Sequence, residues 1–165
     1  MPKVINVSRK FAALEATKEY LEKIDPQEWV WIFIGEPNGD YGPKFNFSSG
    51  IENLPTLKID FWDVSAPQLH FDFSTQKEFT AFPITQEQAR EIYQFLNQHK
   101  GKNIICSCFA GRCRSGAVAQ FCEKYLKYNW PEEFKAKANP NNLVFVYLEG
   151  AWWENFPMNY DTLQG

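Results

Sequence analysis

The chain has 165 residues, of which 44% are hydrophobic and 17% aromatic, so it can bury the core of one domain and is not disordered. Its net charge of -3 disfavours a nucleic-acid partner, because such partners are bound by clustered Lys and Arg. There is no signal-peptide segment and no apolar run approaching the roughly 20 residues that cross a bilayer. We therefore expect a cytoplasmic protein with no membrane partner and with reduced cysteines.

The first elements in chain order are a strand, a helix and a second strand. Residues 3–7, "KVINV", suit a short strand, and Ser8 can cap a helix that runs to about Ile24. Residues 29–35, "WVWIFIG", form a continuous apolar run of strand length, which is typical of a strand covered on both faces. Residues 36–50 are rich in Gly, Pro and Asn, and this composition predicts a surface loop.

The middle of the chain predicts a strand, a long connection and a helix. Residues 56–62, "TLKIDFW", suit a strand, and we expect residues 63–82 to form an irregular connection. Thr85 and Gln88 have the spacing of a capping box and begin a helix that ends near Gly101. The apolar residues at helical spacing that should form its buried face are Ala89, Ile92, Tyr93 and Leu96.

The last third adds a buried strand, a helix and a segment whose secondary structure the sequence leaves open. Residues 102–107, "KNIICS", predict the strand, and the helix begins after the next loop and ends near Asn129. Residues 141–156 have strand propensity, yet Pro140 before them is a residue that often opens a helix. The alternation of strands and helices predicts one α/β domain over residues 1–165, with a central, largely parallel sheet flanked by helices.

Residues 106–115, "CSCFAGRCRS", lie between a predicted buried strand and a predicted helix. Ligands of α/β proteins bind at this position, and the N-terminus of a helix favours anions. Gly111 allows a tight turn, so successive N–H groups can face inward and hold a tetrahedral oxyanion, while Arg114 can grip two of its oxygens. The predicted phosphate-binding residues are Phe109, Ala110, Gly111, Arg112, Cys113 and Arg114.

Cys108 lies at the start of this loop and is the candidate nucleophile. The donors that attract a phosphate would also stabilise a thiolate on Cys108, and a thiolate that faces a phosphoryl group is an activated nucleophile. Ser115 can hydrogen-bond the sulfur and stabilise it when it leaves again. These residues predict phosphoryl transfer through a cysteinyl-phosphate intermediate.

The series Cys108, five residues, Arg114 and Ser115 resembles the C-x5-R-[ST] signature of the protein tyrosine phosphatase superfamily. Ala110 and Gly111 inside the loop make it similar to the version found in dual-specificity-type phosphatases, and the resemblance extends over residues 55–128. It implies a phosphotyrosine phosphatase-like fold. It also implies an enzyme without metal or cofactor that hydrolyses phosphate monoesters, on a phosphorylated protein (phosphotyrosine in particular) or on a small molecule.

The resemblance further implies an aspartic acid on a loop after an upstream strand, which protonates the leaving oxygen and then activates water. Asp63 directly follows "KIDFW" and precedes Cys108 by 45 residues, and it matches bacterial members that have F-D-D in this region. Asp72 precedes Cys108 by 36 residues, which is nearer the spacing of shorter relatives. We expect Asp63 to be the general acid and keep Asp72 as the alternative.

One residue departs from the family pattern. Members of the family usually have His immediately before the nucleophile, where this chain has Ser107. Serine can hydrogen-bond loop carbonyls but carries no charge, so we expect reduced or pH-shifted activity. The departure also leaves open a pseudophosphatase that binds phosphorylated partners without turning them over.

The other cysteines allow two further interpretations of the loop. Zinc binding is disfavoured, because the four cysteines lack the paired C-x2–4-C spacing of structural zinc sites. Cys106 or Cys113 could form a disulfide with an oxidised Cys108, but a buried strand residue and an incidental loop residue are the simpler interpretation. Cys122 is expected to be a core residue of the helix after the loop.

Overall fold

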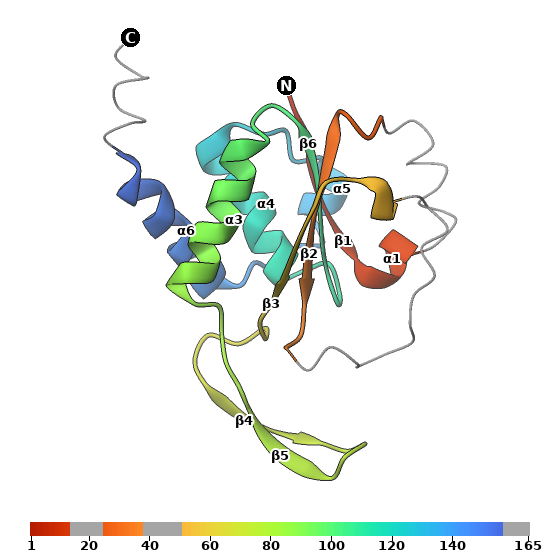
Figure 1. The fold of residues 1–165 in the computed structure, drawn as a ribbon, viewed down its shortest axis with the longest axis vertical. Coiled ribbons are helices and arrows are strands. Elements are labelled where there is room, and N and C mark those ends of the chain that lie inside the picture. The colour runs from red at the N-terminus through yellow and green to blue at the C-terminus, as the bar shows by residue number, and fades with distance from the viewer. Residues whose placement is uncertain (14–24, 38–50, 157–165) are drawn as a thin grey trace.

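A parallel sheet of four strands forms the centre of the chain. The computed structural model describes residues 1–13, 25–37 and 51–156. Neighbouring strands of the sheet are parallel, and the strands lie in the order β1 (Val4–Ser8), β6 (Asn103–Cys108), β2 (Trp29–Gly35) and β3 (Thr56–Asp60) (Figure 1). All four predicted strands are present, and β6 continues through Cys108.

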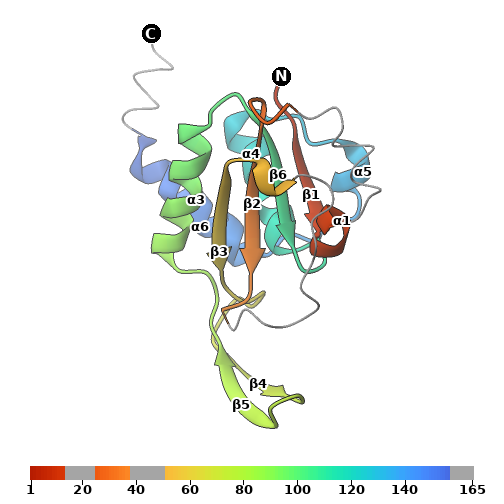
Figure 2. The same cartoon turned by 45° about the vertical axis from the view of Figure 1, so that its right-hand side comes forward.

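Three helices cover one face of the sheet, namely α3 (Gln86–Gln98), α4 (Arg114–Leu126) and α6 (Asn142–Glu154). α3 and α4 contact strands, and α6 packs on both of these helices (Figures 1 and 2). The short helix α1 (Arg9–Ala13) lies on the opposite side. Two further short elements are α5 (Glu132–Lys135), which contacts β1, and the 3-10 helix η1 (Ile51–Asn53), which precedes β3.

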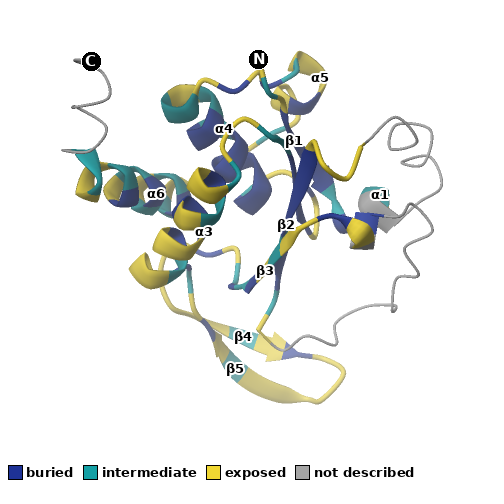
Figure 3. Cartoon of the chain, turned by 45° about the horizontal axis from the view of Figure 1, so that its top comes forward, coloured by how far each residue is buried: buried dark blue, intermediate teal, exposed yellow. Residues whose placement is uncertain are grey.

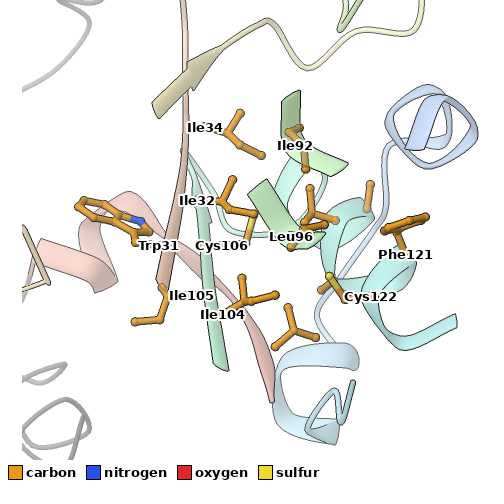
Figure 4. Packing of buried hydrophobic residues seen from close by; sticks show 14 of the residues in the cluster. Trp31, Ile32, Ile34, Ile92, Leu96, Ile104, Ile105, Cys106, Phe121 and Cys122 are labelled. Carbon is orange, nitrogen blue, oxygen red and sulfur yellow. The ribbon is translucent and has the colours of Figure 1, made fainter. Parts of the chain in front are cut away.

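The core consists of apolar side chains on both faces of the two central strands, β2 and β6. Ile32 and Cys106 point toward α3 and α4, whereas Trp31 and Ile105 point to the opposite face (Figure 4). All four are buried, as a parallel sheet with both faces covered requires. The predicted fold class, α/β with a parallel central sheet flanked by helices, is therefore confirmed. No helix within the described ranges is long and apolar enough to cross a membrane.

Two of the predicted helix starts are present in the structure. Thr85 forms the complete capping box with Gln88 at the start of α3, and the four residues predicted for the buried face of α3 are buried. At the start of α1, the Ser8 hydroxyl accepts a hydrogen bond of 2.9 Å from the N–H of Phe11. The predicted continuation of that helix to Ile24, and the predicted loop from residue 38 onward, lie outside the described residues.

The segment whose type stayed open forms helix α6. Asn141 caps this helix, because its side-chain oxygen accepts a hydrogen bond of 3.1 Å from the N–H of Val144. Val144, Leu148 and Ala151 recur at helical spacing and are the buried residues of α6. Packing of this face on α3 and α4 outweighs the strand propensity of the β-branched and aromatic residues.

The expectation of an irregular connection over residues 63–82 is wrong. Most of this segment is an antiparallel hairpin of β4 (Gln68–Asp72) and β5 (Lys77–Ala81). Asp72 holds the turn, because its Oδ1 accepts hydrogen bonds from the N–H and the hydroxyl of Ser74, at 2.9 and 2.6 Å. The hairpin projects beyond the carboxyl ends of the sheet strands (Figure 2).

Candidate active site

All four parallel strands deliver residues to one edge of the sheet. Arg9 directly follows β1, Glu36 follows β2, Phe61 follows β3, and Cys108 ends β6. Ligands of α/β proteins bind at this edge, outside the carboxyl ends of the strands. The loop from Cys108 to Arg114 therefore lies where the sequence predicts a site, and three other strands contribute to its surroundings.

Gly111 gives the loop its tight turn. Its φ of +70° lies in the left-handed region, which strains every residue with a side chain. A Cβ atom at this position would also collide with the backbone of Val7 and Ser8. Both the backbone angle and the close approach to β1 therefore require glycine, as the sequence predicts.

Asparagines outside the loop bind its carbonyl groups. A carbonyl and the N–H of the next residue point in opposite directions across a peptide plane, so the bound carbonyls turn the following N–H groups away from the asparagines. The side chain of Asn6 is buried and is itself held in place, because Trp130 Nε1 donates a hydrogen bond of 2.8 Å to its Oδ1. The bonds run from Asn6 Nδ2 to Gly111 O (2.8 Å), from Asn139 N to Arg112 O (3.0 Å) and from Asn141 N to Cys113 O (2.9 Å).

Cys108 and Ser115 meet across the loop. The distance between Cys108 Sγ and Ser115 Oγ is 3.1 Å, and both residues are buried. Ser115 belongs to the first turn of α4, so its hydroxyl stays fixed beside the sulfur. The serine can therefore donate a hydrogen bond to a thiolate, which is the relationship that the sequence predicts.

The Arg114 guanidinium is buried and held along one side only. Nη1 donates to the carbonyls of Phe61 (2.8 Å) and Gly35 (3.3 Å), and Nη2 donates to Glu36 Oε1 (3.0 Å). In the described part of the chain, Nε has no hydrogen-bond partner although it is buried. An unmet buried donor costs free energy, so Nε is available for an anion that enters the site.

Glu36 joins Arg114 to a second arginine. Its Oε2 accepts a hydrogen bond of 2.6 Å from Arg9 Nη2, and the Arg9 guanidinium lies 5.6 and 5.7 Å from the ring centres of Phe33 and Phe109. Burial alone would raise the pKa of the Glu36 carboxyl, but hydrogen bonds from Arg9 and Arg114 outweigh burial and lower this pKa. Two guanidinium groups share one carboxylate, so the floor of the site keeps a net positive charge.

A pocket of about 530 Å³ lies over the loop, with Cys108 and Arg114 in its lining. Loop residues and the β4–β5 hairpin both wall it. Glu36, Asp63 and Asp72 are its acidic lining residues. Much of the remaining wall is aromatic, and these side chains are Trp62, His70, Phe71, Phe73, Phe79 and Phe109.

The two candidate general acids both line this pocket but differ in their surroundings. Asp63 is exposed, and its Oδ1 accepts a hydrogen bond of 2.8 Å from Asn141 Nδ2. The Cys113 side chain also hydrogen-bonds Asp63. The pKa of the Cys113 thiol is raised, first by burial and then by the nearby Asp63 carboxylate. Asp72 is buried and its Oδ1 holds the hairpin turn, at 2.6 Å from the hydroxyl of Ser74.

The residues around Cys108 occupy distinct positions. Ser107 is fully buried, and its hydroxyl accepts a hydrogen bond of 2.8 Å from Trp31 Nε1. Cys106 and Cys122 are also buried, and burial raises the pKa of both thiols. Arg112 is exposed, and its Nε donates to the carbonyl of Lys137 at 3.0 Å.

Several residues of this site are absent from the sequence-based prediction, namely Asn6, Arg9, Glu36, Trp62 and Asn141. Arg9 and Glu36 carry a detectable signal, because each is a charged residue directly after a predicted strand. Strand ends in an α/β sheet converge on one edge, so charges at these positions are site candidates. The two asparagines act through loop carbonyls and through Asp63, and no local pattern in the sequence indicates such contacts.

Comparison with known proteins rests on structure, because no protein-family model and no curated protein matches the chain. The structure is similar to that of the human tyrosine phosphatase-like serine/threonine/tyrosine-interacting protein, with a TM-score of 0.57. The similarity covers 96% of this chain and 95% of the human one, at 16% sequence identity. The chain has a tyrosine phosphatase-like fold. Tk-PTP in its active form also matches, over 81% of this chain and 84% of its own, at 15% identity and a TM-score of 0.46. Within the phosphatase-like fold, the loop from Cys108 to Arg114 follows the central strand β6 and precedes α4.

Proposed function

We propose that the chain is a cysteine-dependent phosphatase that hydrolyses phosphate monoesters through a cysteinyl-phosphate. The observation that carries this proposal is the pairing of Cys108 Sγ with Ser115 Oγ at 3.1 Å, in a loop whose other end is the buried Arg114. The proposed donors for the phosphate oxygens are the loop N–H groups, which point away from the asparagines that bind the loop carbonyls, and the unpaired Nε of Arg114. A sulfur beside such an anion site is an activated nucleophile.

In the first step, the phosphate of the substrate lies in the loop and Arg114 binds two of its oxygens. The Cys108 thiolate attacks phosphorus, an S–P bond forms, and the bond between phosphorus and the leaving oxygen breaks. Asp63 donates a proton to that oxygen, so the product leaves as an alcohol or phenol. Arg9, Glu36 and Arg114 together carry a net positive charge. This charge stabilises the negative charge that spreads over the phosphoryl oxygens.

In the second step, a water molecule attacks the cysteinyl-phosphate. Asp63, now a carboxylate, accepts a proton from that water as the new P–O bond forms and the S–P bond breaks. The sulfur leaves as a thiolate, and Ser115 stabilises it by donating a hydrogen bond. Inorganic phosphate then leaves the loop, and Cys108 is ready for another substrate.

Asp63 is the better candidate for the general acid, and Asp72 remains the alternative. Asp63 is exposed in the wall of the pocket, and Asn141 and Cys113 orient its carboxyl group. Asp72 is buried, and its Oδ1 already accepts the hydrogen bonds from Ser74 that hold the turn between β4 and β5. Loss of activity in Asp63→Asn with retention in Asp72→Asn would support this assignment.

The aromatic wall of the pocket favours aryl phosphates, including phosphotyrosine in proteins, as the proposed substrates. Six aromatic side chains line it around the phosphate loop, and flat aromatic surfaces pack well on an aryl ring. Phe109 stands next to the nucleophile and remains largely exposed, so it can contact such a ring. We infer that aryl phosphates are hydrolysed more efficiently than alkyl phosphates.

The deciding experiment measures hydrolysis of para-nitrophenyl phosphate by the purified chain. The proposal expects turnover by the wild type, loss of at least about 1000-fold in Cys108→Ser, and near-wild-type rates in Cys122→Ala. Cys122 is a matched control, because it is a buried cysteine of α4 outside the pocket lining. Equal rates in Cys108→Ser and wild type would refute the mechanism.

A pseudophosphatase that binds a phosphorylated partner is the second candidate function. Two observations favour it: Ser107 stands where phosphatases usually have His, and the human protein of similar structure is named a tyrosine phosphatase-like serine/threonine/tyrosine-interacting protein. A wild type that binds a phosphotyrosyl peptide in calorimetry without releasing phosphate would establish this alternative. Cys108→Ser should then bind the same peptide equally well.

A further inference from the structure

The two faces of the β4–β5 hairpin differ in exposure. Side chains alternate between the faces of a strand, and directly paired residues share a face. The paired residues His70 and Phe79 therefore share the inner face, with ring centres 5.6 Å apart. Trp62 packs on them, with its ring centre 5.1 Å from that of Phe79. The inner face of the hairpin, together with Trp62, thus forms part of the pocket wall.

The outer face of the hairpin is apolar and open to solvent. It carries Leu69 and Phe71 from β4, opposite Thr80 and Glu78 of β5, with Phe82 following at the same alternation. The exposed fractions are 69% for Leu69, 47% for Phe71 and 59% for Phe82. Figure 3 shows the hairpin as the most continuously exposed part of the described chain. Adjacent exposed apolar side chains of this size usually mark a binding surface.

Phe71 connects this outer face to the candidate active site. It lines the pocket that contains Cys108 and Arg114, together with Phe73, whose ring centre lies 5.0 Å away in a T-shaped contact. Phe73 is 85% exposed. A ligand whose phosphate occupies the loop and which extends past these two rings therefore reaches the outer face directly.

The charges of this surface restrict the kind of ligand. Glu78 is the charged residue of the outer face, and the described residues place no Lys or Arg on it. A surface of this kind offers nothing to an acidic polypeptide or to an anionic membrane, both of which need basic residues. It suits large apolar side chains of a polypeptide, which gain by leaving water.

We propose that the outer face of the β4–β5 hairpin, formed by Leu69, Phe71 and Phe82, binds the polypeptide part of a phosphorylated protein substrate. The face selects substrates with large apolar residues next to the phosphorylated residue. This inference rests on the proposed function, because it requires the phosphate of the same substrate to occupy the loop at Cys108. The hairpin then determines which phosphoproteins are used, and the loop carries out the chemistry.

The test compares two synthetic phosphotyrosyl peptides that differ only in their flanking residues, Leu and Phe in one and Ser in the other. The wild type should have a kcat/KM about tenfold higher for the apolar peptide. Leu69→Ser and Phe82→Ser should each remove most of this preference, because both side chains belong to the outer face. Neither residue lines the pocket, so hydrolysis of para-nitrophenyl phosphate should stay unchanged.

Two controls separate docking from folding. Val146→Ser removes an exposed apolar side chain from α6, far along the chain from the hairpin, and should keep the peptide preference. Leu69→Met keeps an apolar side chain and should restore the preference that Leu69→Ser loses. Thermal midpoints equal to the wild type would exclude unfolding of the variants.

The outcomes distinguish this inference from the proposed function. Equal kcat/KM values for the two peptides, with intact hydrolysis of para-nitrophenyl phosphate, would overturn the docking surface alone. Absence of all hydrolysis would overturn the proposed function, and binding of the two peptides to the chain would then test the surface independently. Binding to phosphatidylserine vesicles, or dimerisation in sedimentation, that is lost in Leu69→Ser would assign the face to a membrane or a second copy and overturn the inference.

Discussion

Asn141 Nδ2 donates a hydrogen bond of 2.8 Å to Oδ1 of Asp63, while the backbone N–H of Asn141 donates to the carbonyl of Cys113 at 2.9 Å. One residue thus ties the proposed general acid to the phosphate loop. The same side chain caps α6 through its oxygen. The distance between Asp63 and the loop that begins at Cys108 is therefore set by the N-terminus of α6, which packs on α3 and α4.

Asn141→Asp and Asn141→Ala separate these roles. Both variants lose the donor to Asp63, so kcat should fall about tenfold for phenyl phosphate and less for para-nitrophenyl phosphate, whose leaving group needs less protonation. Asp still caps a helix, so only Asn141→Ala should lose the cap, which is worth about 1 kcal/mol of stability, whereas Asn141→Asp places a second carboxylate beside Asp63 and loses stability by repulsion. Thr85→Ala is the matched control: it removes the cap of α3 at a similar cost and should leave kcat unchanged. Equal losses for both substrates would argue against a role of Asn141 in positioning the acid.

Glu36→Gln should weaken both the fold and the binding of phosphate. Two arginines lose the carboxylate they share, which should cost about 2 kcal/mol at pH 7 and raise KM about tenfold. Because the folded state lowers the pKa of Glu36 below 4.5, its stabilising effect is complete above that ordinary value and is lost as pH falls through the lowered one. The stabilities of wild type and variant in urea unfolding should therefore begin to converge below pH 4.5 and meet below the lowered pKa of Glu36.

The control for Glu36→Gln is Glu154→Gln, which breaks the exposed pair of Glu154 and Arg90. Exposed ion pairs contribute little, so this variant should unfold at nearly the same urea concentration as the wild type. A gap between wild type and Glu36→Gln that stays constant down to pH 3 would contradict the ionic origin of the effect.

Gly111→Ala should abolish phosphate binding. The variant requires a left-handed backbone with a side chain and a collision with Val7 and Ser8, which together should cost at least about 2 kcal/mol. Gly101→Ala isolates the first effect, because Gly101 has a φ of +88° but open space around its Cβ position. Gly101→Ala should lose only about 1 kcal/mol of folding stability and keep full activity. Calorimetry with inorganic phosphate, alongside thermal unfolding, measures both quantities.

Ser107→Ala should show what the serine does at the position before the nucleophile. Its hydroxyl binds the indole of Trp31 on the neighbouring strand, so its loss should cost about 1 kcal/mol and loosen the end of β6. Trp31→Phe removes the same hydrogen bond from the other side. If the bond is the main role of Ser107, the double variant should be about 1 kcal/mol more stable than the sum of the two single losses predicts. Additive losses would assign Ser107 another role.

The sequence predicts the frame of this fold well and its hairpin badly. Strands such as residues 29–35 are continuous apolar runs, and α3 carries both a capping box and a helical apolar face, so local patterns suffice. The β4–β5 hairpin places apolar side chains on its exposed face and turns over residues 73–76 without Gly, Pro or Asn. The usual alternation and the turn residues Gly, Pro and Asn are therefore missing there, and the turn depends on Asp72 and Ser74 instead.

For the site, the sequence predicts the groups that lie next to one another in the chain. Cys108 and Gly111 belong to one short loop, Arg114 and Ser115 begin the helix that follows it, and Cys108 meets Ser115 as expected. Arg9, Glu36 and Asn141 come from distant segments. Their contacts depend on β1 and β2 flanking β6, and no local pattern reveals that order.

The position of β6 between β1 and β2 has a consequence for how the chain acquires its site. Val4 pairs with Ile104 and Val30 pairs with the same residue from the other side, so contacts across about a hundred residues must form before the sheet is complete. Such long-range pairing is slow, because the loops it closes are long. During refolding, helices such as α3 can form early, whereas the loop from Cys108 to Arg114 takes its shape only after β6 has inserted between β1 and β2. Recovery of phosphate binding therefore reports the last stage of folding.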